Sequence, residues 1–368
     1  MLGYIKKRYF KNAKNSQLKK GHVTIIMPAY NAEPYIAESI ESVIGQSIED
    51  WKLIILDDGS TDRTVEIAKS YSKGHKSIEL LQKGKQQGPA TQRNLGISKA
   101  DTEFLAFLDS DDLMSPQSLE LRVKILEEDR SACASFSYVR LIDPNGSPMG
   151  LNGTKENIVN FTDLVENKFI TSCICARTSI LQKLGGFDNS FKFGEDWDLW
   201  LRMTRLGFYI KAAPDSFIDY RQHADSFSHK FIYEDFCDRM RVSDLAWQED
   251  ERVPSPLSHF ENGLGPACQS MTSSKKAFLA CISALFDDKT KDAENLLSLV
   301  SFDLLELTDP IQLAEMTKWT VARNISVPLE KWDKIKSSKA HNLESFFEER
   351  PNENSTPYIT KYLGYLTN

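Results

Sequence analysis

Residues 23–31 read VTIIMPAYN, residues 53–60 read LIILDDGS and residues 104–112 read FLAFLDSDD. Each segment begins with an apolar run of the length of one buried strand, and each run stops at a cluster of polar or turn-forming residues. Segments in which apolar residues recur at helical spacing separate these runs. Strands that alternate with helices are the pattern of βα units, which build a mostly parallel sheet. The three segments therefore predict an α/β fold in which helices flank a mostly parallel central sheet.

The same alternation continues on both sides of these segments as far as about residue 213. It predicts further strands over residues 78–81, 132–142, 208–212 and 217–221, and helices over 34–44, 90–100, 116–128 and 197–205. Beyond residue 231 the pattern becomes mainly helical, with expected helices over 274–285, 291–299 and 310–321. The chain is therefore expected to divide into an N-terminal arm (1–21), an α/β domain (22–230) and a mainly α-helical C-terminal region (231–368).

The charge of the chain is unevenly distributed. Its 45 basic and 52 acidic residues give a net charge of −7, a sign that argues against general binding of nucleic acid. Residues 1–32 nevertheless carry seven basic residues and no acidic one. Residues 2–11 mix these cations with aromatic and apolar side chains, as segments at membrane interfaces do. The arm is thus interpreted either as a contact with an anionic membrane surface or as a solvated tail.

The six cysteines have no C-x-x-C spacing, and the N-terminus lacks the apolar stretch of a signal peptide. Residues 173–175 alternate like a buried strand, so their cysteines are expected to serve packing. No apolar run approaches the roughly 18 residues that cross a bilayer. These features predict a cytoplasmic protein, attached peripherally to the cytoplasmic face of the inner membrane if the basic arm binds lipid.

Polar clusters follow three of the predicted strands, at residues 28–31, 57–60 and 109–112. In an open α/β sheet, ligands bind outside the carboxyl ends of the strands. One such cluster alone would be explained as an acidic loop or a helix cap, but three at one edge indicate a binding site. Asp109 and Asp111 place two carboxylates on one short turn, where like charges are costly unless a cation compensates them. The turn therefore predicts a site for Mg²⁺ or Mn²⁺, which prefer oxygen ligands.

Seven short motifs follow one another along the predicted α/β domain. They are VTIIMPAYN (23–31), LDDGS (56–60), GPATQRNLG (88–96), FLDSDDL (107–113), GGFD (185–188), GEDWDLWLR (194–202) and YRQHADSFS (220–228). This ordered set resembles the inverting glycosyltransferases of family 2. The resemblance covers residues 22–230 and implies the GT-A fold of nucleotide-diphospho-sugar transferases, a Rossmann-like α/β architecture.

The resemblance also implies which residues bind the nucleotide-sugar. They are Pro28, Ala29, Tyr30, Asp58, Arg93, Asp109 and Ser110. The first three resemble residues that line the base pocket, and Asp58 resembles the residue that contacts the nucleobase, usually uracil. Arg93 resembles an arginine near the nucleotide, where a guanidinium suits phosphate or base oxygens, and Asp109 resembles an acid on the ribose side. A UDP-sugar is therefore the expected donor.

The metal ligands implied by the resemblance are Asp111 and His223. Asp111 looks like the metal-binding acid of the D-x-D turn. His223 lies in a Tyr-Arg-x-His segment in which related enzymes often supply a metal ligand or a diphosphate contact, although His229 competes for this role and a surface histidine is the structural alternative. The next acid of the turn, Asp112, is at least as well interpreted as a cap for the following helix. The expected cofactor is Mn²⁺ or Mg²⁺.

Glu195 and Asp196 match an acidic pair that precedes a helix in this family, and Asp196 looks like the general base. A positioned carboxylate takes the proton of an acceptor hydroxyl as the new bond forms. The alternative is a negatively charged helix start that complements the helix dipole, but this does not explain the flanking Trp197 and Trp200. By the resemblance, the acceptor attacks opposite the departing nucleoside diphosphate and inverts the anomeric centre.

These inferences predict a hexosyltransferase-type glycosyltransferase of cell-surface polysaccharide or lipopolysaccharide assembly. Its acceptor would be a hydroxyl of a glycan or of a lipid-linked glycan. The chain lacks the glycine-rich motifs of dinucleotide enzymes and P-loop NTPases. The strongest alternative is a non-catalytic descendant that binds nucleotide or glycan and is expected to have lost a key acid. All four key acids are present: Asp58, Asp109, Asp111 and Asp196.

Overall fold

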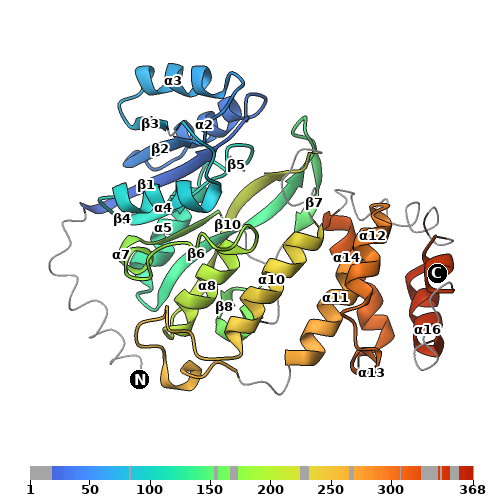
Figure 1. Ribbon diagram of the computed structural model, residues 1–368. Coiled ribbons are helices and arrows are strands. Elements are labelled where there is room, and N and C mark those ends of the chain that lie inside the picture. Colours follow the sequence, from blue (N-terminus) through green and yellow to red (C-terminus); the bar gives the residue numbers. More distant parts are fainter. Residues whose placement is uncertain are drawn as a thin grey trace. The chain divides into compact units, whose positions relative to one another are not determined.

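The computed structural model describes residues 19–82, 84–152, 156–165, 173–223, 232–264, 269–306, 308–324, 339, 342–348 and 356–367. The chain forms two compact units, whose elements are labelled in Figure 1. The first unit comprises the described residues of Met1–Ile142, Leu151–Arg221 and Glu249–Gly263, and the second those of Asp143–Gly150, Gln222–Gln248 and Leu264–Asn368. Residues 1–18 of the expected basic arm lie outside the described residues.

A β-sheet forms the centre of the first unit (Figure 1). The strands of the chain are β1 (Lys19–Ala29), β2 (Trp51–Asp57), β3 (Ile78–Gln82), β4 (Thr102–Phe107), β5 (Leu113–Met114), β6 (Ala132–Ile142), β7 (Pro148–Asn152), β8 (Ile158–Val159), β9 (Ile174–Arg177) and β10 (Tyr209–Arg221). Their order along the main path of the sheet is β3-β2-β1-β4-β9-β6-β10-β5. The β3-β2-β1-β4 half is parallel, whereas β9 runs antiparallel to both its neighbours. The predicted α/β class is confirmed.

Helices connect these strands and build the second unit. Those of the first unit are α2 (Ile36–Ile44), α3 (Thr64–Gly74), α4 (Pro89–Lys99), α5 (Ser118–Glu128), α6 (Phe161–Val165), α7 (Thr178–Lys183), α8 (Glu195–Arg205) and the short 3₁₀ helix η2 (Ser258–Phe260). Those of the second unit are α10 (Ile232–Ala246), α11 (Gln269–Phe286), α12 (Thr290–Leu297), α13 (Phe302–Leu305), α14 (Pro310–Asn324) and α16 (Thr356–Thr367). The expectation of a mainly helical C-terminal region is confirmed for the described residues.

Strands β1, β2 and β4 end at the same edge of the sheet. Ala29, the last residue of β1, lies opposite Asp57, the last residue of β2. On the other side of β1, Ile26 lies opposite Phe107 at the end of β4. Both faces of these strands are buried, which explains their continuous apolar runs. The loops that follow the three strands therefore meet at this edge, as the sequence predicts.

Helix α4 packs closely on β1 at Gly96. A Cβ atom at this position would lie 2.6 Å from Cδ1 of Ile26, so a larger residue would push the helix away from the strand. Arg93 lies one turn nearer the amino end of α4, which follows the loop at the carboxyl edge of the sheet. The absence of a side chain at Gly96 thus helps to set the position of Arg93.

Strand β10 differs from the prediction. The sequence predicts two strands, over residues 208–212 and 217–221, whereas the structure has one strand from Tyr209 to Arg221. The pairing of β10 with β6 shifts register between Ala212 and Phe217, and Asp215 within this shift has a φ of 63°. A local irregularity of this kind bends a strand without ending it. The residues between Ala212 and Phe217 therefore interrupt the apolar pattern of the sequence but not the strand itself.

The second unit has an apolar core of its own. Phe278, Ile282, Leu313 and Tyr362 are fully buried in it, and the hydroxyl groups of Tyr362 and Thr317 lie 2.8 Å apart in a hydrogen bond. Helices α11, α14 and α16 supply these residues. None of the helices in the described ranges combines the length and the apolar character needed to cross a membrane.

Residues Glu249–Gly263, which we name the return segment, follow α10 in sequence yet belong to the first unit. The N–H of Leu257 donates to the carbonyl oxygen of Arg205 at the end of α8 (2.9 Å). The ring of Phe260 packs against that of Phe161 in α6, with 4.8 Å between the ring centroids. The first unit is thus completed by residues that lie beyond the first helix of the second unit.

Candidate active site

The end of β1 supplies three of the residues predicted to contact the nucleotide. Pro28 and Ala29 are buried in the sheet, whereas the side chain of Tyr30 is 44% exposed at its edge. The N–H of Asn31 donates to Oγ of Ser60 in the loop after β2 (3.0 Å). The two loops are therefore joined, and Tyr30 is presented to solvent at the edge where ligands bind in sheets of this type.

Asp58, the predicted nucleobase contact, is only 4% exposed. Its Oδ1 accepts hydrogen bonds from the N–H of Gln87 (2.8 Å) and from the side-chain amide of Gln92, and its Oδ2 accepts one from the N–H of Gly88 (2.8 Å). Asp58 thus holds the loop that precedes α4, and Oδ2 keeps a lone pair for a further donor. The sequence does not predict that Gln92 binds Asp58. The position of Gln92 directly before Arg93 is the one feature of the sequence that could have indicated it.

Arg93 joins two of the predicted acidic groups. Its Nη2 lies 2.6 Å from Oδ1 of Asp109, and its Nη1 lies 2.8 Å from Oε1 of Glu195, while its side chain is 5% exposed. Burial alone would lower the pKa of Arg93, but Asp109 and Glu195 outweigh burial and raise the pKa. Three residues from separate segments, on α4, after β4 and on α8, are therefore brought into one partly buried charge cluster.

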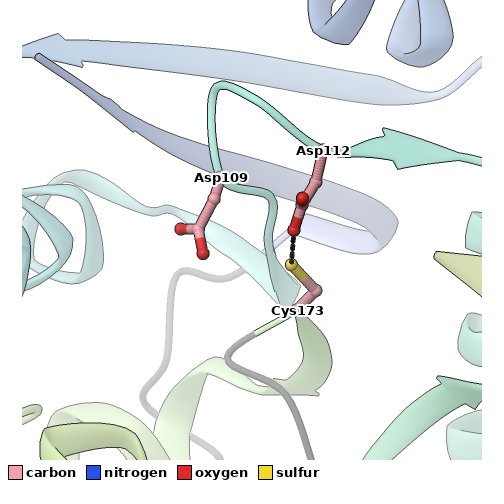
Figure 2. A group of neighbouring side chains, drawn as sticks. All are labelled: Asp109, Asp112 and Cys173. Atoms are coloured by element: carbon pink, nitrogen blue, oxygen red, sulfur yellow. Dashed lines mark hydrogen bonds between the residues drawn. The ribbon is translucent and has the colours of Figure 1, made fainter. Parts of the chain in front are cut away.

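Asp112 anchors the acidic turn that follows β4 (Figure 2). Its carboxylate is buried, with Oδ1 accepting from the N–H of Arg221 (3.0 Å) and Oδ2 from the thiol of Cys173 (3.7 Å). The interpretation of Asp112 as a helix cap is wrong, because α5 begins only at Ser118. The predicted burial of Cys173 is confirmed, but its contact with Asp112 had no signal in the local sequence.

The acidic turn also contains potential ligands for a cation (Figure 2). One oxygen of Asp109, one of Asp112 and Sγ of Cys173 lie within 4.8 Å of one another, the candidate group found among the described residues. Burial, with Asp111 and Asp109 nearby, raises the pKa of Asp112 well above its usual range. Burial and the carboxylates of Asp109 and Asp112 likewise raise the pKa of the Cys173 thiol. Mg²⁺ and Mn²⁺ prefer oxygen ligands to the soft sulfur of a thiol, so the two carboxylates fit either ion and the thiol adds little to that ligand set.

Asp111, the predicted metal ligand, is held through its backbone by Arg221. The Nε of Arg221 donates to the carbonyl oxygen of Asp111 (3.0 Å), and its Nη2 lies 2.6 Å from Oε2 of Glu38 on α2. The guanidinium also stacks over the ring of Tyr35, 4.8 Å from its centroid. The sequence draws attention to the histidine of the Tyr-Arg-x-His segment, and the structure shows that its arginine contacts the acidic turn.

Three other predicted site residues have different placements. Ser110 is buried within the acidic turn. His223 is half-buried, two residues beyond the end of β10, and groups with the second unit. His229 lies outside the described residues. The roles assigned to Ser110 and His223 stay predictions.

Helix α8 presents the predicted catalytic pair in its first turn. It starts at Glu195 after Gly194, whose φ of 69° lies in the left-handed region that favours glycine. The carboxylate of Glu195 is engaged by Arg93, whereas Oδ1 of Asp196 accepts a hydrogen bond from the N–H of Trp197 (2.7 Å). The two neighbouring acids thus differ in their hydrogen bonds, although Asp196 also lies near enough to Arg93 to help raise its pKa.

The aromatic residues of the same helix are anchors. Trp197 and Trp200 are buried, and Nε1 of Trp197 donates to the carbonyl oxygen of Leu164 (2.9 Å). The ring of Trp200 contacts that of Phe187 in the G-G-F-D segment, with 6.1 Å between centroids. A favourable interaction of acids with the helix dipole does not explain these two tryptophans. Their contacts show that they fix α8 against the rest of the first unit.

Comparison with known proteins agrees with this arrangement. The family described as Glycosyl transferase family 2 matches residues 24–185. A putative teichuronic acid biosynthesis glycosyltransferase of Bacillus subtilis, TuaG, is 30% identical over 206 residues, which are 56% of this chain and 81% of that protein. The chain belongs to glycosyltransferase family 2. The putative glycosyltransferase EpsE of the same organism is 30% identical over 65% of this family 2 chain and 85% of EpsE.

Other relatives of this family 2 glycosyltransferase differ in length. The chain is 36% identical to uncharacterized glycosyltransferases of Rickettsia bellii and Haemophilus influenzae, and it spans 27% and 66% of their respective lengths. Among solved structures, S. aureus TarS 1–349 in complex with UDP-GlcNAc has a TM-score of 0.56 and 16% identity, covering 85% of this chain and 92% of that chain. At this identity the likeness concerns the fold alone, and it confirms the GT-A architecture.

Proposed function

We propose that this family 2 glycosyltransferase is a metal-dependent inverting enzyme that transfers a sugar from a UDP-sugar to a hydroxyl of a glycan or lipid-linked glycan. The proposal rests chiefly on Arg93, which pairs with both Asp109 and Glu195. This partly buried cluster joins the acidic turn, which would bind the donor, to the helix that carries the proposed base. The name of TuaG, a putative teichuronic acid biosynthesis glycosyltransferase, supports a pathway of cell-surface polysaccharide assembly.

The donor would bind at the carboxyl edge of β1, β2 and β4. Tyr30 would cover the base, and Asp58, with a lone pair left on Oδ2, would accept a hydrogen bond from it. Asp109 would contact the ribose, with Ser110 beside it, while Arg93 would stabilise negative charge near the diphosphate. The UDP and UDP-GlcNAc complexes of TarS, which shares the fold, support a uridine nucleotide as part of the donor.

A divalent cation would be held by the acidic turn. The carboxylates of Asp109 and Asp112 lie within reach of a common ion, and we propose Asp111 and His223 as further ligands. When bound, the ion supplies Lewis-acid stabilisation of the departing diphosphate. Arg221 keeps the turn in place, because it donates to the Asp111 carbonyl and its N–H binds Asp112.

Asp196 would act as the general base. Its carboxylate takes the proton of the acceptor hydroxyl while the hydroxyl oxygen attacks the anomeric carbon from the face opposite the diphosphate. The bond to the diphosphate breaks in the same displacement, so an α-linked donor gives a β-linked product. Glu195 is held by Arg93 and would keep the start of α8 in register with the donor.

A non-catalytic descendant that binds nucleotide or glycan is the alternative function. The cheapest observation that separates the two is donor hydrolysis, since an active transferase slowly passes its sugar to water. UDP-, GDP- and dTDP-sugars are incubated with the protein, with and without Mn²⁺, and release of the nucleoside diphosphate is measured. We expect manganese-dependent release from one UDP-sugar.

The decisive variant is Asp111→Ala, with Asp101→Ala as a control on an exposed acid just before β4. The proposal expects Asp111→Ala to lose manganese-dependent hydrolysis and Asp101→Ala to keep it. Binding of a nucleotide-sugar with no hydrolysis by the wild type would instead favour the non-catalytic descendant. Hydrolysis that is equally fast without a divalent ion would contradict the metal-dependent mechanism.

A further inference from the structure

The return segment reaches the helix that carries the proposed base through Arg252. Its Nη2 lies 2.8 Å from Oδ1 of Asp198 in the first turn of α8, and its Nη1 lies 2.7 Å from Oδ2 of Asp188 in the G-G-F-D segment. Asp250 also binds this guanidinium, with contacts of 2.8 and 2.9 Å. One arginine thus connects three carboxylates from three separate segments of the first unit.

Asp198 itself is almost fully buried, at 2% exposure, and receives a second arginine. Oδ2 of Asp198 accepts from Arg202 on the next turn of α8 at 2.9 Å. Arg202 in turn donates to the carbonyl oxygens of Leu184 and Gly186, at 3.0 and 2.8 Å. The first turn of α8 is therefore fixed to the loop before Asp188 as well as to the return segment.

The same segment also holds the other end of the helix. The N–H of Leu257 donates to the carbonyl oxygen of Arg205, the last residue of α8, and Phe260 packs on Phe161. These two contacts would keep the return segment attached if the ion pairs of Arg252 were removed. Loss of Arg252 would then release the amino end of α8 selectively, because a buried carboxylate left with fewer partners draws in water or shifts position.

We infer that Arg252 is a positioning residue for the catalytic pair. Through Asp198 it fixes the first turn of α8, and with it the placement of Glu195 and Asp196 relative to the donor. The inference rests on the proposed function, since it assigns Arg252 to the geometry of the base and not to donor binding. The family match ends at residue 185, so this residue lies well outside the matched segment.

The test compares Arg252→Gln with the wild type in donor hydrolysis and in backbone hydrogen exchange. Misplacement of a reacting group by about 1 Å costs up to about 100-fold in rate, so we expect kcat to fall roughly 10- to 100-fold with KM for the donor nearly unchanged. Amides in residues 195–199 should exchange faster, while those of β1 and β4 should keep their protection. Arg252→Lys keeps the positive charge but loses the planar guanidinium that binds two carboxylates through separate nitrogens. This variant should give intermediate values of kcat and of hydrogen exchange.

Arg241→Gln is the matched control, because it removes an arginine from an exposed ion pair with Asp238 on α10. Wild-type kcat and wild-type exchange in residues 195–199 for Arg252→Gln would overturn the inference. Faster exchange throughout the first unit, with kcat and KM changing together, would also overturn it, since Arg252 would then only stabilise the fold.

If Arg252→Gln fails to fold, Arg252→Lys decides between the same outcomes. If the wild-type protein does not hydrolyse any donor, that result contradicts the proposed function instead. Hydrogen exchange in residues 195–199 would then still test whether Arg252 fixes the start of α8.

Discussion

The three acids of the G-E-D-W-D-L-W-L-R motif are chemically similar but have different partners. Glu195 binds Arg93, Asp196 accepts a hydrogen bond from the N–H of Trp197, and Asp198 is buried between Arg202 and Arg252. Spacing along a helix predicts that they share its first turn, but Arg93 and Arg252, which distinguish Glu195 and Asp198, come from distant segments. Roles at the scale of single residues are therefore set by tertiary contacts.

Replacing Asp196 by asparagine tests its role as the base. Asparagine keeps the shape of the side chain and can still accept the hydrogen bond from the backbone, but it takes no proton from the acceptor. General-base groups contribute about 10²- to 10⁴-fold to the rate, so kcat of transfer or hydrolysis should fall by that order. Donor affinity, measured by calorimetry, should stay close to that of the wild type.

Glu195→Gln is the informative comparison for Asp196→Asn. Since Glu195 holds Arg93, which also contacts Asp109, this variant should change donor affinity as well as kcat. If Asp196→Asn retains wild-type kcat while Glu195→Gln loses it, the base has been assigned to the wrong acid of the pair.

At the scale of elements, the sequence predicts the buried strands and the amphipathic helices well. The expected helix over residues 197–205 is α8, although the structure starts it at Glu195, which places both proposed catalytic acids inside the helix. The expected strands over 208–212 and 217–221 are one strand, because backbone pairing with β6 resumes after the irregularity. The short strands β5 and β8 have too few residues to show a period, so only their pairing with β10 reveals them.

Gly96→Ala tests the close approach of α4 to β1. The added methyl group would meet Ile26 at 2.6 Å, and forcing an extra carbon into a packed core costs about 1–3 kcal/mol. The free energy of unfolding, measured with urea, should fall by that amount. Combining it with Ile26→Ala, which removes all three carbons that the methyl group would meet, should cost less than the sum of the two single changes. If the changes in the free energy of unfolding are strictly additive, the added methyl group does not clash with Ile26 and the close-contact explanation is wrong.

Lys276 on α11 gives an element-scale prediction for pH. Burial, with Arg239 and Lys275 nearby and Asp244 opposing them, lowers the pKa of Lys276 to about 7, and its Nζ donates to Oγ of Ser243. Between about pH 7 and the usual lysine pKa near 10.4, the unfolded chain binds more protons at this residue than the folded chain. The contribution of Lys276 to stability therefore rises with pH across this window.

Lys276→Met should remove this dependence. We expect the variant to be more resistant to urea than the wild type at pH 7, with the difference shrinking steadily towards pH 10. Unfolding is followed by circular dichroism at several pH values, and Lys289→Met serves as a control because Lys289 forms an ion pair with Asp287. A difference that is constant with pH would mean that Lys276 stays charged in the folded protein.

At the scale of the whole molecule, the basic arm remains a sequence-based proposal. Residues 1–32 carry seven basic and no acidic residues, and each basic residue near an anionic surface contributes up to about 1 kcal/mol. Changing Lys6, Lys7, Arg8 and Lys11 to glutamine should sharply weaken co-sedimentation with vesicles of phosphatidylglycerol. The wild type should bind less at high salt and little to phosphatidylcholine. Equal binding by wild type and variant would exclude the arm as the contact.

The path of the chain also limits how such proteins can exchange parts during evolution. A recombination joint placed after residue 230 would retain all seven motifs of the family but would replace Arg252, Leu257 and Phe260. Asp198 would then keep only its partner within α8, and the carbonyl of Arg205 would lose the N–H of Leu257. New C-terminal helices can therefore be acquired without loss of function only if residues 249–263 are inherited with the catalytic unit or replaced by an equivalent arginine. Descendants that carry new C-terminal helices should accordingly show crossover points after residue 263.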